Sequence, residues 1–167
     1  MKHRAFPLQQ RMYGLVPYNI SPIQQGIQFG HAVVEYGLMQ QQQDPTDTEL
    51  SPYNQWAHND KTFIILNGGT TNNNSDSFLE LGDMNQAVRR LEDIPIFYAT
   101  FNEPDLGDQL TAIVFLVDER IYDYNQYPTF DFIRDEVSEM EYYETLFGDD
   151  ATWILEMREF LSNYKLA

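Results

Sequence analysis

The sequence predicts an α/β fold in which a mixed four-stranded sheet is flanked by helices as a three-layer sandwich. Short apolar segments and helical repeats follow one another in the order β-α-β-α-β-β. This order requires crossover helices and a final hairpin. Hydrophobic residues make up 43% and aromatic residues 14% of the 167 positions, which is enough to form a core. The length is that of a single domain.

The first half of the chain predicts two strands around a long helix. Residues 12–18 resemble a short strand, and Pro17 marks its end or an edge position. Ser21-Pro22 is typical of a helix start. The helix then has apolar residues at a spacing of three to four, which predicts one apolar face made of Ile23, Ile27, His31, Val34 and Leu38. Residues 44–55 are polar with two prolines and predict a surface loop, and residues 61–66 predict a buried strand.

The next segment predicts a loop, a short helix and a hairpin. Residues 67–77 are rich in Gly and Asn and predict a loop or flexible flap. Asp83 and Gln86 match a variant of the capping box, so a helix is expected over 84–92. Two apolar segments, 94–101 and 110–117, predict the third and fourth strands, and the polar residues between them predict a turn.

The C-terminal part, residues 119–167, predicts an α-helical extension of the α/β domain at 1–118. Two apolar stripes at helical spacing lie within residues 129–165, separated by Gly148 and two acids. The first contains Phe130, Ile133, Val137, Met140 and Phe147, and the second contains Trp153, Met157, Phe160, Leu161 and Tyr164. We expect both stripes to pack on the domain and to leave an acidic outer surface.

Composition excludes several classes of function. The chain has no Cys and three His, so we expect no disulfide framework, no metal site and no organic cofactor. No apolar run has the length of a membrane span, which predicts a cytoplasmic protein without a membrane partner. The net charge is −16, but residues 1–34 contain three basic and no acidic residues. Contact with nucleic acid would therefore need this segment or a local basic cluster.

One stretch, Ile23–Tyr36, contains Gln28, Phe29, Gly30, His31 and Ala32 in succession. It resembles the first helix of the type II peptidyl-tRNA hydrolases, in which a Gln and two small or apolar residues precede His-Ala. The resemblance continues in order over residues 10–118 and includes a Thr at the start of the last strand. Residues 101–111, near the end of this region, resemble the variant of the family that is found in small proteins of tailed bacteriophages.

The resemblance implies an enzyme that hydrolyses the ester between a peptide and the 3′ end of tRNA. Such chemistry needs a positioned water, a proton acceptor and donors for the oxyanion. The resemblance gives these roles to Glu103 or Asp105 as the water-positioning carboxylate, Gln28 as donor and Thr111 as orienting hydroxyl. The family's lysine position is Gln24 here, so the cationic donor is missing. The residues expected to bind substrate are Gln24, His31, Asn102 and Lys61.

Each of these residues also has a structural explanation. Gln28 could cap a loop, His31 could be a partly buried core residue, Glu103 could belong to an ordinary turn, and Thr is common in strands. The alternative function is a catalytically inactive protein on the same scaffold that binds a host protein or a nucleotide, including as an acidic mimic of nucleic acid. A basic groove at Gln28 would favour the hydrolase, and an acidic one would favour binding. Both a monomer and a homodimer are compatible with the sequence.

Overall fold

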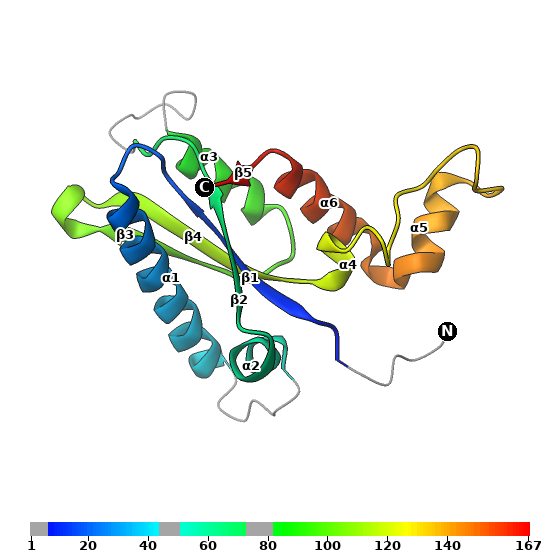
Figure 1. Cartoon of the computed structure of the whole chain (residues 1–167), viewed down its shortest axis with the longest axis horizontal. Coiled ribbons are helices and arrows are strands. Elements are labelled where there is room, and N and C mark those ends of the chain that lie inside the picture. Colours follow the sequence, from blue (N-terminus) through cyan, green and yellow to red (C-terminus); the bar gives the residue numbers. More distant parts are fainter. Residues whose placement is uncertain (1–6, 44–50, 73–81) are drawn as a thin grey trace.

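The computed structural model describes residues 7–43, 51–72 and 82–167. One open sheet contains the strands β1 Gln10–Val16, β2 Thr62–Asn67, β3 Tyr98–Glu103, β4 Gln109–Asp118 and β5 Lys165–Leu166. The helices are α1 Pro22–Gln43, α2 Pro52–Gln55, α3 Asp83–Glu92, α4 Glu119–Tyr122, α5 Glu139–Phe147 and α6 Ala151–Ser162 (Figure 1).

The strand order is β3-β4-β1-β2-β5, so the sheet is mixed, as the sequence predicted, but it has five strands and not four. β1 and β2 are parallel and are connected through α1, whereas β4 runs antiparallel to both β1 and β3. The unpredicted fifth strand is formed by two residues near the C-terminus that pair with the end of β2 (Figure 1). A two-residue strand has no periodicity that a sequence pattern could show.

Alternate residues of β4 belong to two separate cores, one on each face of the sheet. Ile113 and Phe115 pack with side chains from α3 and α6, while Ala112 and Val114 pack with side chains from α1. This alternation is the period of two expected for a strand covered on both faces. Ile154, Met157 and Phe160 of α6 all enter the first core, and Phe160 meets Phe115 edge to face.

The side chains that α1 buries differ from those that the apolar spacing predicted. The face against the sheet contains Gln28, Phe29, Ala32 and Tyr36. The predicted stripe is on the opposite side and faces solvent, with exposed fractions of 77% for Ile23, 45% for Ile27, 62% for Val34 and 49% for Leu38. His31 is exposed as well. The prediction was wrong because α1 has apolar residues on two faces, and the spacing of one face does not reveal which of them is covered.

Gly14 of β1 explains how α1 lies so close to the sheet. A Cβ atom on Gly14 would lie 2.2 Å from the Phe29 ring and 3.1 Å from the carbonyl oxygen of Ile113. Only a residue without a side chain fits here, because real Cβ atoms essentially never make such contacts. The close approach sets the height of α1 above β1 and β4 and therefore positions Gln28, the residue before Phe29.

Several other predictions need correction. Residues 52–55, part of the expected loop, form α2, which continues into a π-helical turn at Trp56–Asp60. Gly82, not Asp83, is the N-cap of α3. Residues 128–138 are not helical, and Phe132 and Ile133 are exposed. α5 therefore starts only at Glu139, after the N-cap Ser138. Residues 44–50 of the predicted loop and 73–77 of the predicted flap lie outside the described residues.

Candidate functional site

The Gln28 side chain links three elements that are far apart in the sequence. It is fully buried. Its Nε2 donates to Oε2 of Glu103 at 2.6 Å and to Oε1 of Gln24 at 3.2 Å. Its Oε1 accepts a hydrogen bond from Oγ1 of Thr111 at 2.8 Å. The resemblance assigned Gln28, Thr111 and either Glu103 or Asp105 to one site, and the structure brings Gln28, Glu103 and Thr111 together.

This geometry changes the role that Gln28 can have. The sequence predicted that its amide would donate to the substrate, but both donor directions already have protein partners. Because the side chain is also fully buried, it cannot meet a developing oxyanion directly. Gln28 is therefore a positioning residue that fixes Glu103 on one side and Thr111 on the other.

Glu103 ends β3 and has a hydrogen bond on each carboxylate oxygen. Oε2 accepts from Gln28, and Oε1 accepts from the backbone N–H of Asp105 at 3.2 Å, which caps the 3-10 turn Pro104–Leu106. The hydrogen bond from Gln28, followed by that from Asp105, lowers the pKa of Glu103 below its usual 4.5. The side chain is partly exposed. Glu103 is thus an ionised, oriented carboxylate at neutral pH, with lone pairs available to a water molecule.

A pocket of about 540 Å³ opens beside this carboxylate. It lies between the start of α1 and the β3–β4 hairpin. Its lining residues are Asn19, Ile20, Ser21, Gln24, Ile27, His31, Glu103, Asp105 and Leu106. The imidazole of His31 stacks face to face on Phe101, with ring centroids 4.4 Å apart. Among the residues that the structure describes, the wall contains two carboxylates and no Lys or Arg, so the pocket is acidic.

The remaining residues predicted for the site divide into two groups. Gln24, His31 and Asp105 line the pocket. Asn102 instead donates to the backbone carbonyl of Asp108 at 2.9 Å and so stabilises the hairpin turn. Lys61 precedes β2, at the end of that parallel strand opposite to the pocket. The structure therefore does not bring Lys61 to the site.

The other cations considered as substitutes for the missing lysine also lie elsewhere. The guanidinium group of Arg11 lies 3.7 Å from the centroid of the Tyr122 ring, near the start of β1. Arg89 is an exposed residue of α3. Neither residue lines the pocket beside Glu103, which we call the Gln28 pocket after the buried side chain that positions Glu103. Sequence analysis missed Asn19, Ser21 and Leu106, whose residue types are ordinary for a helix start and a turn.

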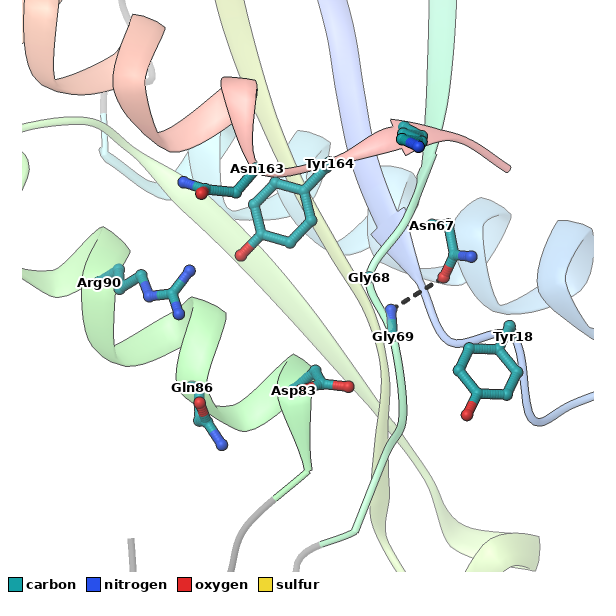
Figure 2. Close-up of a pocket in the computed structure, with 10 residues that line it drawn as sticks. Tyr18, Asn67, Gly68, Gly69, Asp83, Gln86, Arg90, Asn163 and Tyr164 are labelled. Carbon is teal, nitrogen blue, oxygen red and sulfur yellow. Dashed lines mark hydrogen bonds between the residues drawn. The ribbon is translucent and has the colours of Figure 1, made fainter. Parts of the chain in front are cut away.

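A second pocket, of about 460 Å³, lies on the other side of the segment that joins β1 to α1. Tyr18 faces this second pocket and Asn19 faces the first. Figure 2 shows Arg90, Gln86 and Asp83 of α3 opposite Tyr164 and the backbone of Gly68 and Gly69. Lys165 also lines it. The only signal in the sequence was the pair Arg89-Arg90, which is also typical of a solvated helix face.

Buried Thr71 helps to fix the wall between the two pockets. Its Oγ1 donates to the carbonyl of Leu110 at 2.6 Å. The backbone N–H of Thr71 donates to Oδ1 of Asn19 at 3.3 Å, and Nδ2 of Asn19 donates back to the carbonyl oxygen of Thr71 at 3.5 Å. The segment after β2 is thus tied both to the start of β4 and to Asn19, in the segment before α1. These hydrogen bonds hold Asn19, which lines the first pocket, and Asn19 adjoins Tyr18, which lines the second.

No group of three His, Asp or Glu side chains in the described part of the chain could hold a metal ion. Within the same residues, no helix is long and apolar enough to cross a membrane. The chain matches no family model, and no curated protein or solved structure is significantly similar to it. The class of protein is therefore inferred from the fold and the site alone: an α/β protein with a mixed sheet and an acidic pocket built around a buried glutamine.

Proposed function

We propose that this protein is an ester hydrolase of the type II peptidyl-tRNA hydrolase kind and that the Gln28 pocket is its active site. The observation that supports it most is the pair of hydrogen bonds made by Gln28, which donates to Glu103 at 2.6 Å and accepts from Thr111 at 2.8 Å. These residues come from α1, β3 and β4, and the resemblance points to Gln28, to Thr111 and to either Glu103 or Asp105. We also propose that the order of layers, helix on sheet on helix, follows that family.

In this proposal Glu103 positions a water molecule and accepts its proton. A carboxylate with a lowered pKa remains ionised at neutral pH and can orient the water, although the lowered pKa also makes it a weaker base. General-base catalysis contributes roughly 10²- to 10⁴-fold to a rate, and we expect Glu103 to lie at the low end of that range. The attack would take place in the pocket, against an acyl carbonyl held beside His31 and Gln24. Thr111 does not touch the substrate but keeps the Gln28 amide oriented toward Glu103.

The oxyanion would be stabilised by dipoles and not by a cation. α1 is 22 residues long and its first turn borders the pocket, so the positive end of the helix dipole faces the reacting carbonyl. The side chains of Asn19, Ser21 and Gln24 add polar groups on the same wall. These dipoles stabilise the negative charge of the oxyanion less than a lysine would, so we expect slow turnover.

The phosphates of a tRNA end would be repelled by Glu103 and Asp105. The cations nearest to this end of the sheet are Arg90 and Lys165, in the adjoining pocket. We therefore expect the ribose and the ester to occupy the acidic pocket, while phosphates lie toward Arg90, across the wall that includes Tyr18 and Asn19.

The alternative is a protein that has kept the scaffold without the chemistry and binds a partner. The observation that favours it is the acidity of the pocket wall, which among the described residues has no Lys or Arg and two carboxylates. Such a wall attracts a cationic side chain or amine more readily than a nucleic acid. In this case the pocket would bind a basic segment of a host protein.

The decisive measurement is the loss of ester from peptidyl-tRNA above the uncatalysed rate. We expect wild-type protein to be active and Glu103→Gln to lose about 10²-fold or more. Glu136→Gln is the matched control, because Glu136 is exposed, distant in sequence and undergoes the same loss of charge. Gln24→Lys should raise the rate, because it restores a cation at the pocket wall. Wild-type protein without turnover would refute the hydrolase and leave the binding function.

A further inference from the structure

α1 has a solvent-facing apolar stripe that no segment within residues 7–43, 51–72 and 82–167 covers. It consists of Ile23, Ile27, Gly30, Val34 and Leu38, and its four large residues are between 45% and 77% exposed. The stripe points directly away from the buried face of the same helix. A contiguous row of large aliphatic side chains in water is typical of an interface.

The spacing within this stripe is symmetric about its centre. The sequence numbers of Ile23 and Leu38 sum to 61, and so do those of Ile27 and Val34. If two copies of α1 cross antiparallel, with the two-fold axis between residues 30 and 31, Ile23 of one copy meets Leu38 of the other, and Ile27 meets Val34. Each contact then occurs twice, which is the defining property of an isologous interface.

Gly30 lies beside the axis and would allow the two backbones to approach closely. A Cβ atom on Gly30 would have no neighbour within 4 Å, and the same is true of Gly26. The monomer therefore gives neither glycine a packing role, although a glycine inside a helix costs about 0.5–1 kcal/mol relative to alanine. A partner helix packed against this face would explain why the position has no side chain.

Charge also favours a second copy at this face. The protein has a net charge of −16, so two copies repel each other over most of their surfaces. α1 contains one charged residue, Glu35, in 22 positions. Glu35 is about 100° from Val34 around the helix, so it lies beside the stripe and the stripe itself contains no Asp, Glu, Lys or Arg.

We propose that the protein forms a two-fold symmetric homodimer through antiparallel packing of the α1 stripes. The stripe spans 15 residue steps, or about 22 Å at the rise of an α-helix. A contact between two single helices falls at the low end of the size range of specific interfaces. The dimer is therefore concentration-dependent, with dissociation in the micromolar range. Each pocket would then have the partner's Val34 beside its lining residue Ile27.

The first test is sedimentation velocity of the full chain over a range of concentrations. Wild-type protein should pass from monomer to dimer. Val34→Glu places a charge in the middle of the stripe and should weaken association about a hundredfold. Gln42→Glu adds the same charge near the end of α1, off the stripe, and should leave association unchanged. A wild-type protein that stays monomeric at high micromolar concentration, or a Val34→Glu protein that still dimerises, would overturn the proposal.

A second variant distinguishes close packing of the two helices from non-specific hydrophobic association. Gly30→Leu makes the exposed face more apolar, so it should strengthen any non-specific association. In the proposed dimer the leucine would hold the helices apart and weaken association. In the monomer the side chain has open space, so the fold should be retained, which circular dichroism would verify. Stronger association of this variant would contradict the proposed register.

Cysteine cross-linking can determine the orientation, because the natural chain has no Cys. A mixture of Ile23→Cys and Leu38→Cys proteins should form a mixed disulfide dimer under mild oxidation. Each variant alone should cross-link poorly, since the two copies of residue 23, or of residue 38, lie at opposite ends of the antiparallel pair. Efficient cross-linking of each variant with itself, without the mixed product, would indicate parallel helices and refute the proposal.

Discussion

The two pockets that flank the segment between β1 and α1 are built in contrasting ways. The first depends on buried side chains, since both Gln28 and Thr111 are inaccessible to solvent and hydrogen-bonded to each other. The second is a gap between surface elements, lined by exposed Arg90 and Lys165 and by the backbone at Gly68. A buried network fixes the geometry of its pocket, whereas exposed side chains leave theirs adjustable.

The two pockets also differ in charge and in the parts of the chain that form them. Every described lining residue of the first belongs to positions 19–106, and its ionisable groups are mainly acidic. The second takes Asn163, Tyr164 and Lys165 from the C-terminal end and has two cations, Arg90 and Lys165, with one carboxylate, Asp83. In a chain of net charge −16, two cations in one pocket are notable. The comparison indicates that the C-terminal segment supplies positive charge beside an acidic site.

The largest expected effect on stability is that of Gln28→Ala. A Gln that donates to substrate would have to be accessible, but the side chain of Gln28 is fully buried. Its removal leaves a cavity and takes a partner from Thr111, so we expect a loss of about 2–4 kcal/mol in the free energy of unfolding. Gln42→Ala, at an exposed position near the end of the same helix and outside the network, should change it by less than about 0.5 kcal/mol. Urea denaturation of both variants measures the difference, and equal values would show that the network contributes nothing.

Gly68→Ala should disturb the second pocket and the core beneath it. A Cβ atom would lie 2.2 Å from Sδ of the buried Met84 and 3.1 Å from Cβ of Leu15. We expect destabilisation of about 1–3 kcal/mol, the usual cost of overpacking. The matched variant is Gly26→Ala on α1, where the new methyl group meets nothing, and this should stabilise the protein by about 0.5–1 kcal/mol. Thermal unfolding would test the predicted destabilisation by Gly68→Ala and the predicted stabilisation by Gly26→Ala. A Gly68→Ala protein of unchanged stability would mean that Met84 and Leu15 move aside without cost.

A truncation after Ser162 should disrupt the second pocket and leave the first intact. It removes β5 and the lining residues Asn163, Tyr164 and Lys165, but it leaves α6 in place. We expect a loss of about 1–2 kcal/mol, mainly from the half-buried Tyr164. The acidic pocket should survive, as judged by an unchanged Glu103 titration. A change in that titration would show that the C-terminal strand also supports the first pocket.

The smallest expected effect concerns pH. The pKa of Glu103 is lowered in the folded state, chiefly by the hydrogen bond from Gln28. Its contribution to stability is therefore present above the unfolded pKa and is lost as the pH falls through the folded value. Gln28→Met removes the donor, so the pKa of Glu103 should rise toward 4.5, which carboxyl NMR can follow. The stability difference between the two proteins should shrink in acid, and an unchanged pKa would assign the shift to another group.

Much of the fold was determined by local patterns in the sequence. The strand preceding Ser21-Pro22, the strand after Trp56 and the final hairpin were predicted within a few residues of their positions, because turn residues and apolar runs are local signals. Residues 129–138 were predicted to be helical and are not. Their apolar spacing resembles a helix, but in the structure the segment contains a turn in which Asp131 and Asp135 accept backbone hydrogen bonds.

The sequence by itself pointed, through a resemblance, to Gln28, to Thr111 and to either Glu103 or Asp105 as members of one site. Only the tertiary structure decided their roles. It buried the amide of Gln28, left His31 exposed and turned Ile23 and Val34 outward. It also brought Arg90 and Lys165 to one pocket. Burial and charge proximity depend on contacts between segments far apart in the chain, and a local pattern contains no information about which of two apolar helix faces the sheet will cover.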